Sequence, residues 1–126
     1  MKIPFNIPYL TGREEGYLLE AVRSRRHCGN HQFAERCIRF MKEKYGFHEV
    51  FLTPSATAAL EMGALLADLK PGDEVVLPSY TFSSTGNAVV LTGATPVFCE
   101  VDPQTMNVDL DDMARRITPR TRLLLP

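Results

Sequence analysis

The chain has 126 residues, of which 44% are hydrophobic and 23% are charged, and these values are typical of a globular protein rather than a disordered or repetitive one. Its 14 Lys and Arg residues nearly balance its 15 Asp and Glu residues, so the net charge of −1 offers no basic excess for nucleic acid. No apolar run reaches the roughly 18 residues of a membrane helix, and no CxxC pair occurs among the three cysteines, which predicts a cytoplasmic protein that binds neither membranes nor nucleic acid.

The first 45 residues predict an extended arm followed by two helices, and we expect them to form an N-terminal part of their own, 1–45. The sequence from Thr11 to Glu14 matches a capping box, in which Thr11 caps a helix to about residue 25 and Glu14 reaches back. A break follows this helix, and Asn30 is the expected cap of a second helix that ends before Gly46.

Short apolar strands alternate with helices over the rest of the chain, 46–126. Strands are expected at 49–53, 74–78, 95–101 and 120–125, and helices at 56–68, at 82–92 and directly after Asp109. This alternation indicates βαβ units and therefore an α/β fold with a mostly parallel sheet. The apolar residues just before Pro126 predict a buried strand that a further helix should cover, so we expect the chain to be the first, truncated part of a longer protein.

A turn of small residues between the first expected strand and the helix at 56–68 is a candidate anion site. Backbone N–H groups at a helix start, together with the helix dipole, favour a phosphate, and Ser55 and Thr57 add hydroxyl donors. The alternative is that Ser55 serves only as a helix cap.

A second hydroxyl-rich segment, 79–87, follows the strand at 74–78. Ligands of parallel sheets sit beyond the carboxyl ends of strands, so this segment should face the same side as the first turn. Phe82 or Tyr80 would offer an aromatic ring for a planar ligand to stack on. The alternative is an aromatic side chain in the core, with the polar residues as caps.

No metal site is predicted. His27 and His31 have a metal-like spacing, but Cys28 between them is too close to complete an ordinary site. The sequence also lacks GxGxxG, GxxxxGK[ST] and HExxH motifs, which leaves dinucleotide, P-loop and zincin readings without support. The acidic cluster around Asp109 sits at a helix start, where carboxylates complement the dipole.

Six short motifs occur in order along the chain. They are Ser55-Ala56-Thr57-Ala58-Ala59-Leu60, Lys70-Pro71-Gly72-Asp73-Glu74-Val75, Pro78-Ser79-Tyr80-Thr81-Phe82, Gly93-Ala94-Thr95-Pro96-Val97-Phe98, Asp102-Pro103-Gln104-Thr105-Met106-Asn107 and Ile117-Thr118-Pro119-Arg120-Thr121. With them the whole chain resembles the N-terminal portion of the DegT/DnrJ/EryC1/StrS sugar aminotransferases, pyridoxal-phosphate enzymes of fold type I. The resemblance implies the first part of their aspartate aminotransferase-like large domain, a three-layer α/β/α arrangement that starts at about residue 46.

Within that family, the segments Cys28-Gly29, Phe33–Cys37 and Thr53-Pro54-Ser55 look most like those of dTDP-4-amino-4,6-dideoxygalactose transaminases. The resemblance then implies transfer of an amino group from glutamate to C4 of a dTDP-4-keto-6-deoxyhexose. Such enzymes serve the biosynthesis of lipopolysaccharide and other bacterial surface polysaccharides. The family also implies a homodimer with shared active sites.

The resemblance assigns roles to eight residues. The phosphate of pyridoxal 5'-phosphate would lie against Ser55, Ala56, Thr57 and Ala58 at the helix start. Phe82 would stack on the pyridine ring, and Thr85 would line the same pocket. Gly29 and Asn30 belong to a turn that resembles the substrate entrance.

No catalytic residue is assigned, because the family's Schiff-base lysine is expected beyond Pro126. The four lysines of the chain, Lys2, Lys42, Lys44 and Lys70, all fall outside the matching motif. Two alternatives therefore remain open. One is a non-catalytic truncated chain that lacks the lysine, and the other is a sugar dehydratase of the same family, in which histidine replaces that lysine.

Overall fold

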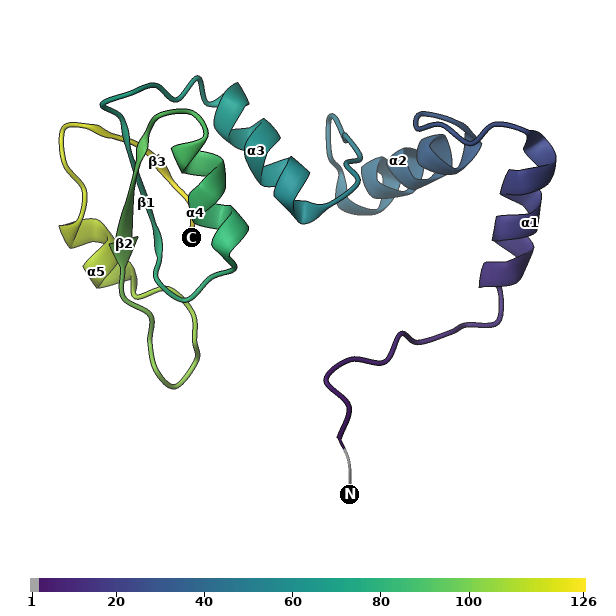
Figure 1. Ribbon diagram of the computed structural model, residues 1–126, viewed down its shortest axis with the longest axis horizontal. Helices are drawn as coiled ribbons and strands as arrows, with labels where there is room; N and C mark the ends of the chain where they lie inside the picture. Colours follow the sequence, from purple (N-terminus) through teal and green to yellow (C-terminus); the bar gives the residue numbers. More distant parts are fainter. Residues whose placement is uncertain (1–2) are drawn as a thin grey trace. The chain divides into compact units, whose positions relative to one another are not determined.

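The computed structural model of the chain describes residues 3–126 and divides into two compact units. The first unit ends at Leu52 and the second spans Thr53–Pro126 (Figure 1). None of the helices in the described residues is both long enough and apolar enough to cross a membrane.

The first unit contains α1 (Glu14–Ser24), whose start differs from the predicted capping box. The expected cap at Thr11 is wrong, because the cap position is Arg13 and no side chain bonds the first turn. The expected reach of Glu14 is confirmed: its carboxylate accepts the Thr11 N–H and hydroxyl at 2.8 Å each and the Gly12 N–H at 2.9 Å. These hydrogen bonds lower the pKa of Glu14 to about 2. The Thr11 hydroxyl oxygen accepts, at 3.4 Å, the N–H of Arg13, which lies before the first helical residue.

The second helix of this unit, α2 (Gln32–Tyr45), begins one residue later than predicted. His31 holds the cap position in extended backbone, whereas Asn30 has a left-handed φ of 61° and turns the chain, so the expected Asn30 cap is wrong. The expected end is confirmed, because Gly46 has φ 71° and its N–H donates to the Lys42 carbonyl at 2.9 Å. Tyr17 packs edge-to-face on Phe33 and joins the two helices.

The second unit is built around three parallel strands in the order β2-β1-β3. They are β1 (Glu74–Pro78), β2 (Thr95–Cys99) and β3 (Thr121–Leu124). The strand predicted at 49–53 is wrong, since that segment is irregular. An extended segment becomes a strand only when it finds a ladder partner, and the ladders of the described sheet join β1 to β2 and β3.

Helices cover both faces of this sheet, which confirms the predicted α/β fold in its three-layer form. The helices α3 (Ala56–Leu66) and α4 (Ser83–Val90) lie on one face, where Val75 and Leu77 of β1 join the apolar cluster of that layer. The short α5 (Leu110–Arg115) lies on the other face, where Val76 packs with Met113 and Cys99. Alternation along β1 thus divides its fully buried side chains between two cores.

The turn between α4 and β2 requires glycine for two reasons. Gly93 has φ 83°, a conformation that side chains rarely adopt, and a Cβ there would lie 2.8 Å from Cγ of Pro71. This close approach packs the predicted turn at Lys70–Asp73 against the end of α4.

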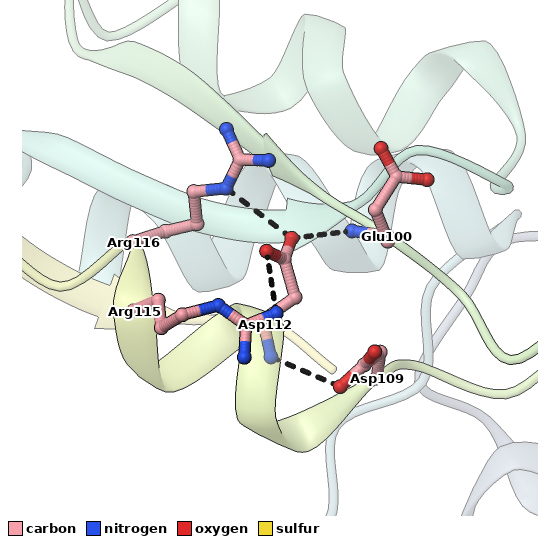
Figure 2. Close-up of polar contacts among 5 residues, drawn as sticks. All are labelled: Glu100, Asp109, Asp112, Arg115 and Arg116. Carbon is pink, nitrogen blue, oxygen red and sulfur yellow. Dashed lines mark hydrogen bonds and ion pairs between the residues drawn. The ribbon is translucent and has the colours of Figure 1, made fainter.

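A buried carboxylate ties α5 to the end of β2 (Figure 2). Asp112 is 6% exposed, and its carboxylate accepts the Glu100 backbone N–H at 2.9 Å, Arg115 Nη2 at 3.1 Å and Arg116 Nε at 3.2 Å. The Glu100 N–H is the largest of the causes that lower the pKa of Asp112, and the two guanidinium groups add to it. Asp109 confirms its predicted role, because its side chain caps α5 by accepting the Asp112 N–H at 2.9 Å.

Replacing this carboxylate with its neutral isostere should destabilise the protein. Asp112→Asn removes the charge that pairs with Arg115 and Arg116, and we expect Tm to fall by about 5 °C or more. Because folding lowers the pKa of Asp112, its stabilisation is complete above the ordinary value of 3.8 and is lost as the pH falls through the lowered value. Melting curves from pH 7 to pH 2 should therefore converge for Asp112→Asn and the parent protein at the acid end.

The exposed neighbour in the same helix turn is the matched control. Asp111→Asn removes one negative charge from α5 without touching the Glu100 N–H, so its Tm should stay close to that of the parent. Equal losses in the two variants would contradict a specific role for the buried carboxylate.

Candidate functional site

The start of α4, the start of α3 and the loop at 79–82 all lie toward the carboxyl edge of the sheet. Both helices run back against the direction of the parallel strands, so their first turns lie toward the carboxyl ends of those strands (Figure 1). The loop is fixed to this edge because Ser79 N–H donates to the Cys99 carbonyl at the end of β2, at 2.8 Å. The edge is where ligands of parallel α/β sheets bind.

The first turn of α3 confirms Ser55 as its cap. Ser55 has extended backbone and its hydroxyl oxygen accepts the Ala58 N–H at 3.1 Å, while its carbonyl accepts the Ala59 N–H at 3.1 Å and the Thr53 hydroxyl at 2.9 Å. The N–H groups of the two residues between, Ala56 and Thr57, therefore precede the helical ladder. Capping and ligand binding are compatible here, because the Ser55 hydroxyl accepts the Ala58 N–H and leaves those of Ala56 and Thr57 for a ligand.

The electrostatics of this turn favour an anion. The first turns of α1 and α5 carry Glu or Asp side chains that neutralise the helix dipole, whereas the first turn of α3 carries none. Thr57 and Ala58 are half-buried, which keeps part of the turn away from bulk water. Hydroxyl and N–H donors without a competing carboxylate suit a phosphate.

An aromatic side chain stands at the start of α4. Phe82 holds the cap position of that helix and is 75% exposed, and Tyr80 in the same loop is 64% exposed. The alternative of a core aromatic is wrong for Phe82 in this structure. An exposed ring at the carboxyl edge leaves its face open to a planar ligand.

Thr85, the other residue predicted near the ring, is 8% exposed and already engaged. Its hydroxyl is 2.9 Å from that of Thr81, and its N–H donates to the Phe82 carbonyl at 2.9 Å. These two contacts hold the loop that carries Phe82 against the first turn of α4.

The remaining predicted site residues, Gly29 and Asn30, lie in the first unit, in the turn between α1 and α2. The same turn contains a contact that residue spacing did not predict: Cys28 Sγ lies 3.0 Å from Nε2 of His31. Over residues 3–126, no three His, Cys, Asp or Glu side chains are grouped so that they could hold a metal ion.

An apolar groove of about 470 Å³ borders the start of α3. It runs between α3, α4 and the end of β3, and its lining includes Ala56, Leu60, Val89 and Leu125. Sequence reasoning missed this groove because residues far apart in the chain form it.

Comparison with known proteins places the chain among aminotransferases. Residues 13–126 match the DegT/DnrJ/EryC1/StrS aminotransferase family. A dTDP-4-dehydro-2,3,6-trideoxy-D-glucose 4-aminotransferase of Saccharopolyspora spinosa is 55% identical over 76 residues, which are 60% of this chain and 20% of that protein. The spore coat polysaccharide biosynthesis protein SpsC of Bacillus subtilis is 36% identical over 128 residues, covering 98% of this chain and 32% of that protein.

A solved structure supports the same fold. NtdA of Bacillus subtilis, with its bound cofactor PMP, superposes with a TM-score of 0.83 at 29% identity, over 99% of this chain and 31% of that one. The chain thus spans between a fifth and a third of the length of these relatives.

Proposed function

Because the chain belongs to the DegT/DnrJ/EryC1/StrS aminotransferase family, we propose that it forms the phosphate- and ring-binding part of a pyridoxal 5'-phosphate site in a sugar aminotransferase. The observation that carries this proposal is the first turn of α3, where the backbone N–H groups of Ala56 and Thr57 precede the helical ladder and no acidic side chain neutralises the dipole. The PMP bound to the structural relative supports the class of cofactor.

In this proposal the start of α3 anchors the phosphate. Ala56 and Thr57 donate their backbone N–H groups, and the hydroxyls of Thr57 and Ser55 donate beside them. Ser55 can serve both purposes, because it accepts the Ala58 N–H through its oxygen and keeps its own proton for the phosphate. Ala58, which is half-buried, contributes a small side chain that lets a phosphate approach the turn.

The start of α4 orients the ring. Phe82 covers one face of the pyridine and excludes water from it, and Thr85 acts as a positioning residue through its contacts to Thr81 and Phe82. When bound, the cofactor supplies an electron sink for reactions at the carbon that bears the amino group. The residues of this chain contribute orientation and charge complementarity.

Lys70 does not serve as the base of this site. It lies in the turn that leads into β1, at the amino edge of the sheet, and its ammonium is 2.7 Å from the Asp68 carboxylate. That ion pair raises the pKa of Lys70, which keeps the amine protonated.

For the reaction we propose transfer of an amino group from glutamate to C4 of a dTDP-4-keto-6-deoxyhexose, in a homodimer. The name of the Saccharopolyspora spinosa relative, a 4-aminotransferase acting on a dTDP-linked dehydro sugar, supports both the nucleotide and the carbon position. Gly29 and Asn30 are the proposed contacts to the sugar nucleotide.

The test uses the full-length protein with pyridoxal 5'-phosphate, glutamate and a dTDP-4-keto-6-deoxyhexose, and products are identified by mass spectrometry. We expect 2-oxoglutarate and a dTDP-4-amino sugar in equal amounts. A deoxygenated sugar without nitrogen would instead identify a dehydratase. Failure to bind the cofactor, measured by its absorbance after gel filtration, would overturn the proposal and favour a non-catalytic chain.

A further inference from the structure

The turn between α1 and α2 brings a thiol and an imidazole into contact outside the proposed cofactor site. Cys28 Sγ lies 3.0 Å from Nε2 of His31, within hydrogen-bond distance. The left-handed backbone of Asn30 folds the chain back between the two residues and makes this contact. Both side chains line a hollow of about 250 Å³ that is open to solvent, with Gln32 and Phe33 on its wall.

We propose that Cys28 and His31 form a thiol–imidazole pair that reacts with soft electrophiles, so that Cys28 is a site of covalent modification. A nucleophile within hydrogen-bond distance of a base is the arrangement that activates thiols in proteins. In the tautomer with its proton on Nδ1, the His31 ring accepts the thiol proton at Nε2. The hollow gives a small reagent access to the sulfur.

The chemistry balances with an alkyl halide as the electrophile. The Cys28 proton moves to His31 Nε2, the sulfur attacks carbon and forms an S–C bond, and the carbon–halogen bond breaks to release halide. The imidazolium then returns its proton to water. No oxidant or reductant is consumed in this step.

The two other cysteines provide internal comparisons. Cys37 on α2 is exposed like Cys28, whereas Cys99 at the end of β2 is buried. Burial raises the pKa of the Cys99 thiol, with the Asp112 carboxylate adding to the effect. Among residues 3–126, the contact between a thiol and an imidazole is made by Cys28. Reactivity should therefore fall in the order Cys28, Cys37, Cys99.

The experiment is timed alkylation of the full-length protein with iodoacetamide at pH 7, followed by cleavage after glutamate and mass spectrometry. Cleavage after Glu20, Glu35 and Glu43 places Cys28 and Cys37 on separate peptides. We expect Cys28 to react about tenfold faster than Cys37, because His31 lies within hydrogen-bond distance and can accept the thiol proton as the sulfur attacks. Equal rates would overturn the proposal.

His31→Gln tests the base directly. His31 holds the cap position of α2 without a side-chain capping bond, and its carbonyl, which accepts the Glu35 N–H, is kept in the variant. The Cys28 rate should fall to that of Cys37, whereas the matched variant His27→Gln, in the same turn, should keep the parent rate. An unchanged Cys28 rate in His31→Gln would also overturn the proposal, and circular dichroism would verify that α2 is retained.

Discussion

Replacing Leu77 with alanine is expected to lower the free energy of unfolding by about 3 kcal/mol. Leu77 is 0% exposed and lies in the apolar cluster that joins β1 to α3 and α4, with Val75 and Val89 as neighbours. Truncation removes three carbon atoms from a packed core and leaves a cavity, because the central strand is held by ladders on both sides and cannot move into the space. Urea denaturation followed by circular dichroism measures the loss.

A leucine on the surface of the same layer is the matched control. Leu66 at the end of α3 is 77% exposed, so Leu66→Ala should change the free energy of unfolding by no more than about 0.5 kcal/mol. A Leu77→Ala variant with the stability of Leu66→Ala would contradict the assignment of Leu77 to a packed core.

The helices and strands of the second unit were predictable where turn or cap residues flank a run of apolar residues. The bounds of β1 match the prediction, because a short apolar run between a Pro-Gly turn and a proline is typical of a strand in a parallel sheet. Ser55 and Asp109 were predicted as caps because each is the short polar residue directly before a helical pattern. The parallel sheet followed from the alternation of strands and helices, and the three-layer arrangement followed from the resemblance to the family.

The errors occur where several local solutions compete. Thr11 and Asn30 are both good capping residues, yet Glu14 binds the Thr11 hydroxyl and Asn30 turns the chain instead. The residue type alone does not decide which residue caps a helix, because the cap position also depends on where the chain turns. The segment 49–53 has the composition of a strand, but composition does not supply the ladder partner that a strand needs.

In the candidate site, too, features that depend on local sequence could be predicted, whereas contacts between side chains could not. The candidate anion site at the start of α3 could be proposed from the sequence, because it depends on the backbone of one helix start and on Ser55 and Thr57, and anion binding there stays a prediction. The contact between Thr81 and Thr85 and that between Cys28 and His31 were not, because they depend on side-chain directions across a turn. From spacing alone the sequence predicted no metal site at the histidines, and it gave no indication of a base beside the thiol.

Thr57→Glu is expected to separate cofactor binding from folding at the start of α3. The carboxylate enters a first helical turn that has no acidic side chain, where it should complement the dipole and leave the Tm of the cofactor-free protein unchanged or slightly raised. In the proposed site the same charge opposes the phosphate and removes a hydroxyl donor. We expect the affinity for pyridoxal 5'-phosphate to fall by about 100-fold, on the scale of a lost charge-assisted hydrogen bond.

Two controls show whether the lower affinity of Thr57→Glu arises from its effect on the phosphate of the cofactor. Gln32→Glu adds the same charge to the first turn of α2, in the other unit, and should leave the affinity unchanged. Pyridoxal, which lacks the phosphate, should bind the parent and Thr57→Glu equally, because its ring contacts Phe82 in the proposed site. Equal losses for both ligands would mean that the substitution disturbs the ring pocket, and α3 would then no longer be the phosphate anchor. A loss of affinity for the phosphorylated ligand alone would show that the start of α3, with its unneutralised dipole, binds the phosphate.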